Sequence, residues 1–289
     1  MSGSAPVVHA DRPLGSGRHQ GDRTGTPAVA AAVRRRILRF AVDQPVHLGP
    51  SLSVADILVT VCAAMGLGPS FPDDPARDRL ILSKGHAVWA LYAVLAERGV
   101  LDLDRHDGPL AGHPHEETAG VEVSTGSLGH GLSVAAGLAE AGRLDGHQGV
   151  VHVVLGDGEL NEGSVWEAVM FAAHRRLDRL VALVDANGMQ QEGRTAEVLD
   201  LSPLEAKWRA FGWHTAEVDG HDHLALAAAL ADARAQRHRP SVILCHTIKG
   251  KGVPFMEHRA EWHVGRLSTE QLATALAAVG ATADSGSDD

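Results

Sequence analysis

Cysteine is nearly absent from this chain of 289 residues, which contains only Cys62 and Cys245. Two cysteines are too few for a disulfide framework or a cysteine-rich metal site. Both occur within apolar segments, Val59-Thr60-Val61-Cys62 and Val242-Ile243-Leu244-Cys245. We therefore expect two buried free thiols, which behave as small hydrophobic side chains.

Long apolar segments are also missing. No stretch reaches the roughly 18 to 20 uninterrupted apolar residues that a membrane-spanning helix needs. The first residues lack the apolar core of a secretory signal peptide. These two absences lead us to expect a cytoplasmic protein that has no membrane partner.

The chain also has no excess of basic residues. The chain has 26 Lys and Arg residues against 36 Asp and Glu residues, which gives a formal net charge of -10. A general nucleic-acid-binding protein carries a basic face, so this composition argues against nucleic acid as a partner. We expect a small-molecule substrate instead.

A single domain accounts for most of the chain. Residues 1–25 are rich in Gly, Ser, Pro and Arg without periodicity, and residues 281–289 have a similar composition, so both ends read as disordered tails. Residues 26–280 contain no internal repeat and are long enough to bury a substantial core. We therefore predict one domain over residues 26–280.

Helix signals recur through this domain. Thr26 followed by Pro27 is typical of an N-cap and a first helical position, which predicts a helix through about Val42. Three further predicted helices run from an N-cap at Ser53 to Gly66, from His86 to Arg98 with Gly99 ending it, and from about Leu128 to Leu144.

Short apolar segments alternate with these helices. The predicted strands cover residues 80–82, 150–155, 180–184 and 242–245. Continuous apolar runs suit strands that are buried on both faces. The alternation predicts an α/β fold with a parallel sheet and helices on both faces. Ligands of such folds bind beyond the carboxyl ends of the strands.

The segment after the strand at residues 150–155 has the features of a phosphate site. It reads Gly156-Asp157-Gly158 and leads into a helix. The two glycines allow a sharp turn and a close approach of the backbone to a ligand. The free N–H groups of the helix N-terminus suit a diphosphate.

The next strand ends at Asp185-Ala-Asn187-Gly-Met189. If the two strands are neighbours, the Asp157 carboxylate, the Asn187 side-chain oxygen and the Met189 carbonyl can share one cation. Mg²⁺ requires about six hard oxygens and usually takes some from phosphates; Ca²⁺ or Mn²⁺ could substitute. Gly-Asp-Gly alone is more often a tight turn. With Asn187 about thirty residues later, the arrangement resembles the signature of thiamine diphosphate enzymes.

Seven segments in one order sharpen this resemblance. Together they cover roughly residues 27–270 and resemble the transketolase family. They are Leu82-Ser-Lys-Gly-His-Ala87, Gly112-His-Pro114, Ser124-Thr-Gly-Ser-Leu-Gly-His-Gly-Leu132, Gly156-Asp-Gly-Glu-Leu-Asn-Glu-Gly-Ser-Val-Trp-Glu-Ala168, Asp219-Gly-His221, Thr247-Ile-Lys-Gly-Lys-Gly252 and Glu261-Trp-His263. The resemblance implies a thiamine diphosphate-binding fold.

The resemblance also implies roles for individual residues. Asp157, Asn187 and Met189 would hold the metal. The residues that would contact the cofactor are His86, Gly126, Ser127, Leu128, Gly158, Asn187, Lys249 and His263. Donors of this kind neutralise a polyanion.

Substrate chemistry is implied for three histidines and two glutamates. His47, His113 and His263 match histidines that face the substrate in transketolases, a role that suits groups exchanging protons near neutral pH. Glu162 and Glu167 match acidic residues that link two active sites across a dimer interface. A glutamate near a helix start is also favoured by the helix dipole alone, and that alternative stays open.

A complete transketolase is longer than this chain. Its pyrimidine-binding domain carries the glutamate that activates the cofactor, and a C-terminal domain follows. The chain resembles the N-terminal subunit of a split transketolase, so we expect it to be active only with a C-terminal-like partner subunit, in an α₂β₂ assembly. Truncation of a longer chain is the other explanation.

Three functions remain open on the sequence alone. The first is transfer of a two-carbon ketol unit from a ketose or ketose phosphate donor to an aldehyde acceptor. The second is delivery of a two-carbon unit to a lipoyl or acyl-carrier-protein thiol in a specialised biosynthetic pathway. The third is a non-catalytic scaffold, which the intact Asp157 and Asn187 disfavour.

Overall fold

A computed structural model describes residues 26–68, 76–103 and 110–284. Within them lies a five-stranded sheet of order β1-β2-β3-β5-β4 in which every neighbouring pair is parallel. The strands are β1 Arg79–Leu82, β2 Val151–Gly156, β3 Leu180–Ala186, β4 His214–Asp219 and β5 Ser241–His246. The predicted parallel α/β fold is therefore confirmed.

The register of the two central strands decides where the site lies. Gly156 at the end of β2 is paired with Asp185 near the end of β3. Asp157 and Asn187 consequently leave the sheet side by side at its carboxyl edge. The prediction that their strands are neighbours is correct.

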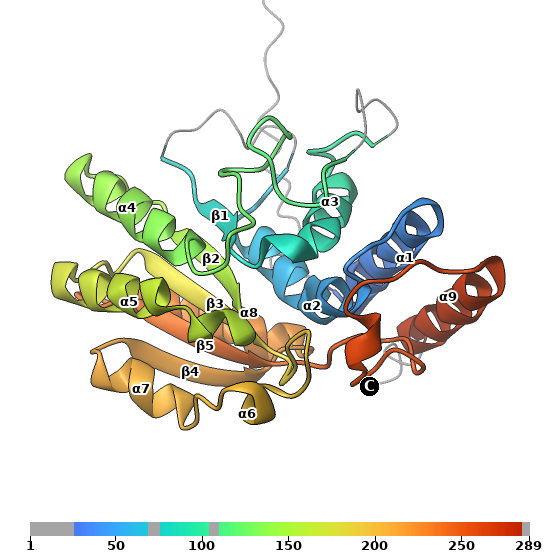
Figure 1. The fold of residues 1–289 in the computed structure, drawn as a ribbon. Coiled ribbons are helices and arrows are strands. Elements are labelled where there is room, and N and C mark those ends of the chain that lie inside the picture. Colours follow the sequence, from blue (N-terminus) through green and yellow to red (C-terminus); the bar gives the residue numbers. More distant parts are fainter. Residues whose placement is uncertain (1–25, 69–75, 104–109, 285–289) are drawn as a thin grey trace, which may run out of the picture.

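Helices cover both faces of the sheet (Figure 1). One buried apolar cluster joins one face to α1, α2, α3, α8 and α9, and a second joins the other face to α4, α5 and α7. The first layer comprises α1 Pro27–Asp43, α2 Leu48–Ala64, α3 Val88–Glu97, α8 His223–Ala235 and α9 Thr269–Asp284. The second comprises α4 Gly131–Leu144, α5 Gly163–Arg175 and α7 Leu204–Ala210. A short α6, Thr195–Val198, follows β3.

The first helix forms as predicted. The Thr26 side chain accepts a hydrogen bond from the Val29 amide at 3.3 Å, and Pro27 occupies the first turn. Proline is tolerated there because its missing N–H would have had no helical partner. Both cysteines are buried and free, as expected.

The predicted start of the second helix was wrong. α2 begins at Leu48 rather than after Ser53, because Pro50 falls within the first turn, where proline does no harm. Ser53 is not a cap. Its hydroxyl donates to the Asp185 carboxylate at 2.6 Å, so the residue belongs to a buried polar network.

Two other helices start later than predicted. A 3₁₀ turn, Gly85–Ala87, precedes α3, while Gly99 adopts a φ of 69° just after the helix, as predicted. α4 begins at Gly131 rather than near Leu128, because Gly129 has a φ of 84° and its amide is bound elsewhere.

The edge strand and the C-terminal end of the domain also differ from the prediction. β4 was not predicted, because its residues are only half buried and include Glu217 and Asp219. α9 runs to Asp284, four residues beyond the predicted domain end at 280. The predicted tail at 1–25 and residues 285–289 lie outside the described residues. No helix in the described part of the chain is long and apolar enough to span a membrane.

Candidate functional site

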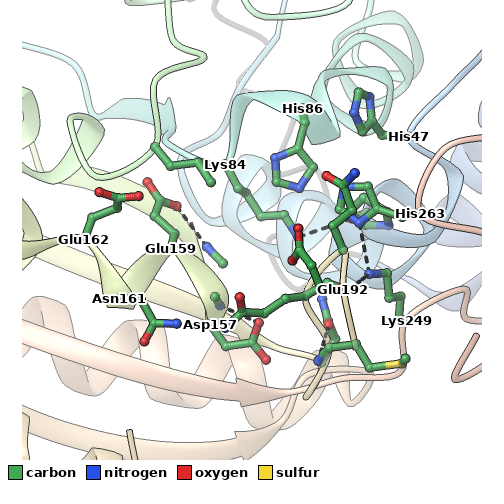
Figure 2. A pocket seen from close by; sticks show the side chains of 18 of the residues that line it. His47, Lys84, His86, Asp157, Glu159, Asn161, Glu162, Glu192, Lys249 and His263 are labelled. Carbon is green, nitrogen blue, oxygen red and sulfur yellow. Dashed lines mark hydrogen bonds between the residues drawn. The ribbon is translucent and has the colours of Figure 1, made fainter. Parts of the chain in front are cut away.

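A pocket of about 380 Å³ opens at the carboxyl edge of the sheet. Figure 2 shows His47, His86 and His263 on one side of it and Glu159, Asn161 and Glu162 on the other. Most of the predicted site residues line this pocket, namely His47, His86, His113, Gly126, Leu128, Asp157, Gly158, Glu162, Asn187, Met189, Lys249 and His263.

Backbone amides hold the Asp157 carboxylate at the floor of the pocket. Its two oxygens accept from the Gly158 amide at 2.8 Å and from the Gly188 amide at 2.6 Å. Gly188 stands between Asn187 and Met189, so this contact brings all three predicted metal ligands together. Burial, followed by the charge of Asp185, raises the pKa of Asp157 to about 6.

Two hydrogen bonds from its side-chain nitrogen orient the amide of Asn187. Its Nδ2 donates to the Asp185 carboxylate at 3.3 Å and to the Ser53 hydroxyl at 3.4 Å. With the nitrogen engaged there, Oδ1 accepts a hydrogen bond from the Met189 amide at 3.1 Å. Outer contacts of this kind orient metal ligands.

Asp185 itself is fully buried and lies at the centre of a polar network. It forms an ion pair with Lys84 and accepts hydrogen bonds from Ser53 and Thr247. Burial opposes ionisation of this carboxyl, but Lys84 and the hydrogen bonds from Ser53 and Thr247 together keep the pKa of Asp185 below its ordinary value. A buried charge is tolerated only when it is paired and hydrogen-bonded in this way.

The residues present suit one divalent cation that is shared with a diphosphate. They offer one carboxylate, one amide oxygen and one backbone carbonyl, all hard oxygen donors of the kind Mg²⁺ prefers. Among the described residues no group of three His, Cys, Asp or Glu side chains could hold a metal alone. This set would therefore need oxygens from the cofactor to complete it.

Glu159 holds together the side of the pocket that lies opposite His47, His86 and His263. The carboxylate, which is 2% exposed, accepts from the Gly129 amide at 2.9 Å, from the Gly156 amide at 3.0 Å and from the Ser83 hydroxyl. It thereby ties the ends of β1 and β2 to the loop that carries Gly126, Ser127 and Leu128.

Four histidines meet on the remaining side. The ring of His47 lies with its centroid 5.4 Å from that of His86, 6.2 Å from that of His113 and 5.5 Å from that of His263. The rings of His86 and His263 stack at 5.4 Å. Segments far apart in the sequence thus supply a single cluster.

Three of these rings, those of His47, His86 and His263, are neutral at physiological pH. Burial, followed by the nearby His113, lowers the pKa of His47 to about 4. Burial, followed by Lys84, lowers the pKa of His86 to about 2. Burial, followed by Lys249, lowers the pKa of His263 to about 3. A neutral imidazole carries one donor and one acceptor, so each can hold or pass a proton.

Lys249 sets the tautomer of one of them. Its Nζ donates to the Gln190 carbonyl at 2.9 Å and to Nδ1 of His263 at 3.0 Å. Because Nδ1 accepts, the proton of the neutral His263 ring is on Nε2. Burial, followed by Lys84, lowers the pKa of Lys249 to about 8, which leaves it mainly charged at neutral pH.

Two predicted residues lie elsewhere. Ser127 lines a shallower depression next to the pocket, together with His130 and Val134. Glu167 lies on α5, is exposed and is not among the residues that line the pocket. Met170 and Phe171 on the same helix are 50% and 44% exposed. The interface role of Glu162 and Glu167 stays a prediction.

Sequence reasoning missed the supporting residues Lys84, Glu159 and Asp185. Each is a charged residue at the end of a buried strand or just beyond it, within a segment quoted above. A charge in such a place is costly unless it is paired, and that signal could have identified them.

Replacing Glu159 by glutamine should destabilise the chain by about 1–3 kcal/mol. The amide nitrogen of glutamine cannot accept a hydrogen bond, so a buried N–H of Gly129 or Gly156 would lose its partner. Urea unfolding measures the effect. Glu167→Gln, at an exposed position, is the control and should stay within about 0.5 kcal/mol of the unchanged chain. Equal values for the two variants would contradict the role of Glu159.

Acidification should destabilise the chain through the histidine cluster. Below the unfolded pKa of 6.5, the unfolded chain binds protons that native His47, His86 and His263 do not bind until their lowered pKa values. Stability therefore falls as the pH drops from 6.5. His86→Gln removes one group that takes up a proton on unfolding. Urea unfolding near pH 7 and pH 5 should therefore show a smaller loss of the free energy of unfolding for this variant, as for about one proton fewer. An unchanged slope would refute the lowered pKa of His86.

Comparison with known proteins agrees with this geometry. Residues 35–285 match the family described as transketolase, thiamine diphosphate binding domain. A 6-deoxy-6-sulfo-D-fructose transketolase subunit of a Clostridium species is 44% identical over 239 residues, which are 80% of this chain and 87% of that protein. One subunit of the apulose-4-phosphate transketolase of Phocaeicola vulgatus is 38% identical over 80% of this chain and 84% of its own length.

Full-length transketolases match over a smaller share of their length. Human transketolase is 42% identical over 66% of this chain and 32% of its own sequence. The transketolase structure from Leishmania mexicana superposes with a TM-score of 0.78 and 30% identity, over 88% of this chain and 41% of that one. The chain thus spans about two fifths of that solved transketolase. It belongs to the transketolase family, and its match is to the thiamine diphosphate binding domain of that family.

Proposed function

We propose that this chain is the cofactor-binding subunit of a two-component transketolase. One observation carries the proposal: the predicted metal ligands and the four neighbouring histidines line a single pocket. In such an enzyme a two-carbon ketol unit passes from a ketose donor to an aldehyde acceptor. The partner would be a C-terminal-like subunit that completes the cofactor site, in an α₂β₂ assembly.

Some residues of the chain would bind the metal and the diphosphate, and others would transfer protons. Asp157, Asn187 and the Met189 carbonyl would hold Mg²⁺, while Lys249 would neutralise the diphosphate. Thiamine diphosphate, when bound, supplies the nucleophilic carbon and the electron sink needed to break a C–C bond beside a carbonyl.

Proton transfer falls to His47, His113 and His263. His263 presents its Nε2–H as a donor because Lys249 occupies Nδ1. His47 is neutral and so can also accept a proton from a substrate hydroxyl.

Recognition of an acidic substrate group would come from the partner. The lysines among the described lining residues are Lys84 and Lys249, and the described lining contains no arginine. Lys84 is paired with Asp185, and Lys249 is already assigned to the diphosphate of the cofactor. The names of two relatives refer to a sulfonated and a phosphorylated sugar. For a donor or acceptor of that class, we place the anion site on the other subunit.

Reconstitution of the two subunits tests the activity. The pair, with thiamine diphosphate and Mg²⁺, should transfer a two-carbon unit between a ketose phosphate and an aldose phosphate, and neither of the two should do so by itself. Transfer to a lipoyl or acyl-carrier thiol without transfer between sugars would support the specialised alternative instead. A pair that shows no heat of cofactor binding would be a scaffold.

Replacing Asp157 by alanine should weaken cofactor binding to the pair by more than about 100-fold, because the variant loses the charged member of the predicted metal set. Calorimetry with thiamine diphosphate in the presence of Mg²⁺ measures the Kd. Asp145→Ala, at the exposed end of α4, is the matched control and should bind as the unchanged chain does. Retained affinity in Asp157→Ala would rule out the metal assignment.

A further inference from the structure

Another buried carboxylate, that of Asp56, lies outside the pocket. Asp56 on α2 is 4% exposed and forms an ion pair with Arg34 of α1. Two histidines from the segment after β4 also contact it, His221 with Nδ1 2.6 Å from Oδ2 and His223 with Nε2 3.2 Å from Oδ1. Burial opposes ionisation of Asp56, yet Arg34 and the two histidines hold its pKa well below the ordinary value.

His221 faces in two directions. Its Nε2 accepts a hydrogen bond from the backbone amide of Ile248 at 2.9 Å. An accepting Nε2 leaves the ring proton on Nδ1, which therefore donates to Asp56. The His221 ring therefore joins α2 to the loop after β5, with one hydrogen bond that it donates and one that it accepts. The Asp219-Gly-His221 motif brings it there by turning sharply after β4, with the Gly220 amide donating to the His246 carbonyl at 2.7 Å.

Ile248 is followed directly by Lys249, whose Nζ contacts Gln190 and His263 in the pocket. Other supports of this loop come from elsewhere, among them the His258 amide, which donates to the Lys249 carbonyl at 3.0 Å. The Thr247 hydroxyl donates to Asp185, and the Gly250 amide donates to the Gly49 carbonyl at 3.1 Å. His221 is the contact that connects the residue before Lys249 to the buried charge of Asp56.

We propose that His221 is a positioning residue for cofactor binding, which fixes the backbone at Ile248 and thereby the direction of the Lys249 side chain. The inference rests on the proposed function, since it assigns to Lys249 the diphosphate as its target. His221 itself does not line the pocket. Its effect is transmitted through one backbone hydrogen bond.

His223 provides a matched control. It is 6% exposed and contacts the same carboxylate, and its Nδ1 lies 2.8 Å from the Thr60 hydroxyl. These contacts are all with α2 rather than with the loop. Replacing His223 also removes a contact with Asp56 but leaves the bond to Ile248 in place.

Two substitutions separate the two bonds of His221. Asparagine places its amide near the position of Nδ1, so His221→Asn can still donate to Asp56 but cannot reach Ile248. Glutamine places its oxygen near the position of Nε2, so His221→Gln can still accept from Ile248. A merely structural role predicts that both variants lose stability without a specific loss at the loop.

Hydrogen exchange of the isolated chain and calorimetry of the reconstituted pair with thiamine diphosphate and Mg²⁺ test the proposal. In His221→Asn, we expect the Ile248 amide to exchange roughly tenfold faster and the cofactor Kd to rise roughly tenfold, as for loss of about 1.4 kcal/mol. His221→Gln should recover most of both effects, and His223→Asn should show neither.

The proposal is overturned if His221→Asn matches the unchanged chain in both measurements, or if His223→Asn shows the same losses. Imidazole ¹⁵N shifts of the unchanged chain add a test that needs no variant. They should show the His221 proton on Nδ1, and a proton on Nε2 would also overturn it. If the unchanged pair binds no cofactor, the proposed function fails, whereas Ile248 exchange still decides whether His221 fixes the loop.

Discussion

The buried ion pair between Lys84 and Asp185 is the interaction on which the rest of the site depends. It joins the segment after β1 to the end of β3, and Asp185 also binds Ser53 of α2 and Thr247 after β5. Four segments are thereby fixed around one negative charge. The same carboxylate accepts a hydrogen bond from the Asn187 amide, so the supporting network contacts one of the predicted metal ligands directly.

The sequence was enough to predict those parts of the fold that have strong local signals. Thr26-Pro27 predicts the first helix, and four apolar runs predict the four strands that are largely buried. β4 was not predicted, because an edge strand that contains Glu217 and Asp219 lacks a continuous apolar run. The start of α2 was not predicted correctly. Proline usually marks a helix boundary, but it is harmless in a first turn, where Pro50 lies.

Within the site, the residues that carry chemistry were easier to predict than those that support them. Asp157 and Asn187 stand at strand ends, where parallel sheets bind ligands. The roles of Glu159, Asp185 and His221 depend on partners 30 to 165 residues distant in the chain. Only the folded arrangement brings those partners together, so a local pattern can mark such a residue but cannot reveal which partner it takes.

On this proposal the chain supplies one half of a shared site, namely the metal ligands, the diphosphate contacts and the histidines. A structure of the two subunits with thiamine diphosphate and Mn²⁺, phased by anomalous scattering, tests this most directly. We predict a single metal peak bound by Asp157, the Asn187 side-chain oxygen, the Met189 carbonyl and two diphosphate oxygens, with Lys249 facing the diphosphate. A metal bound elsewhere, or a cofactor held entirely by the partner, would contradict the proposal.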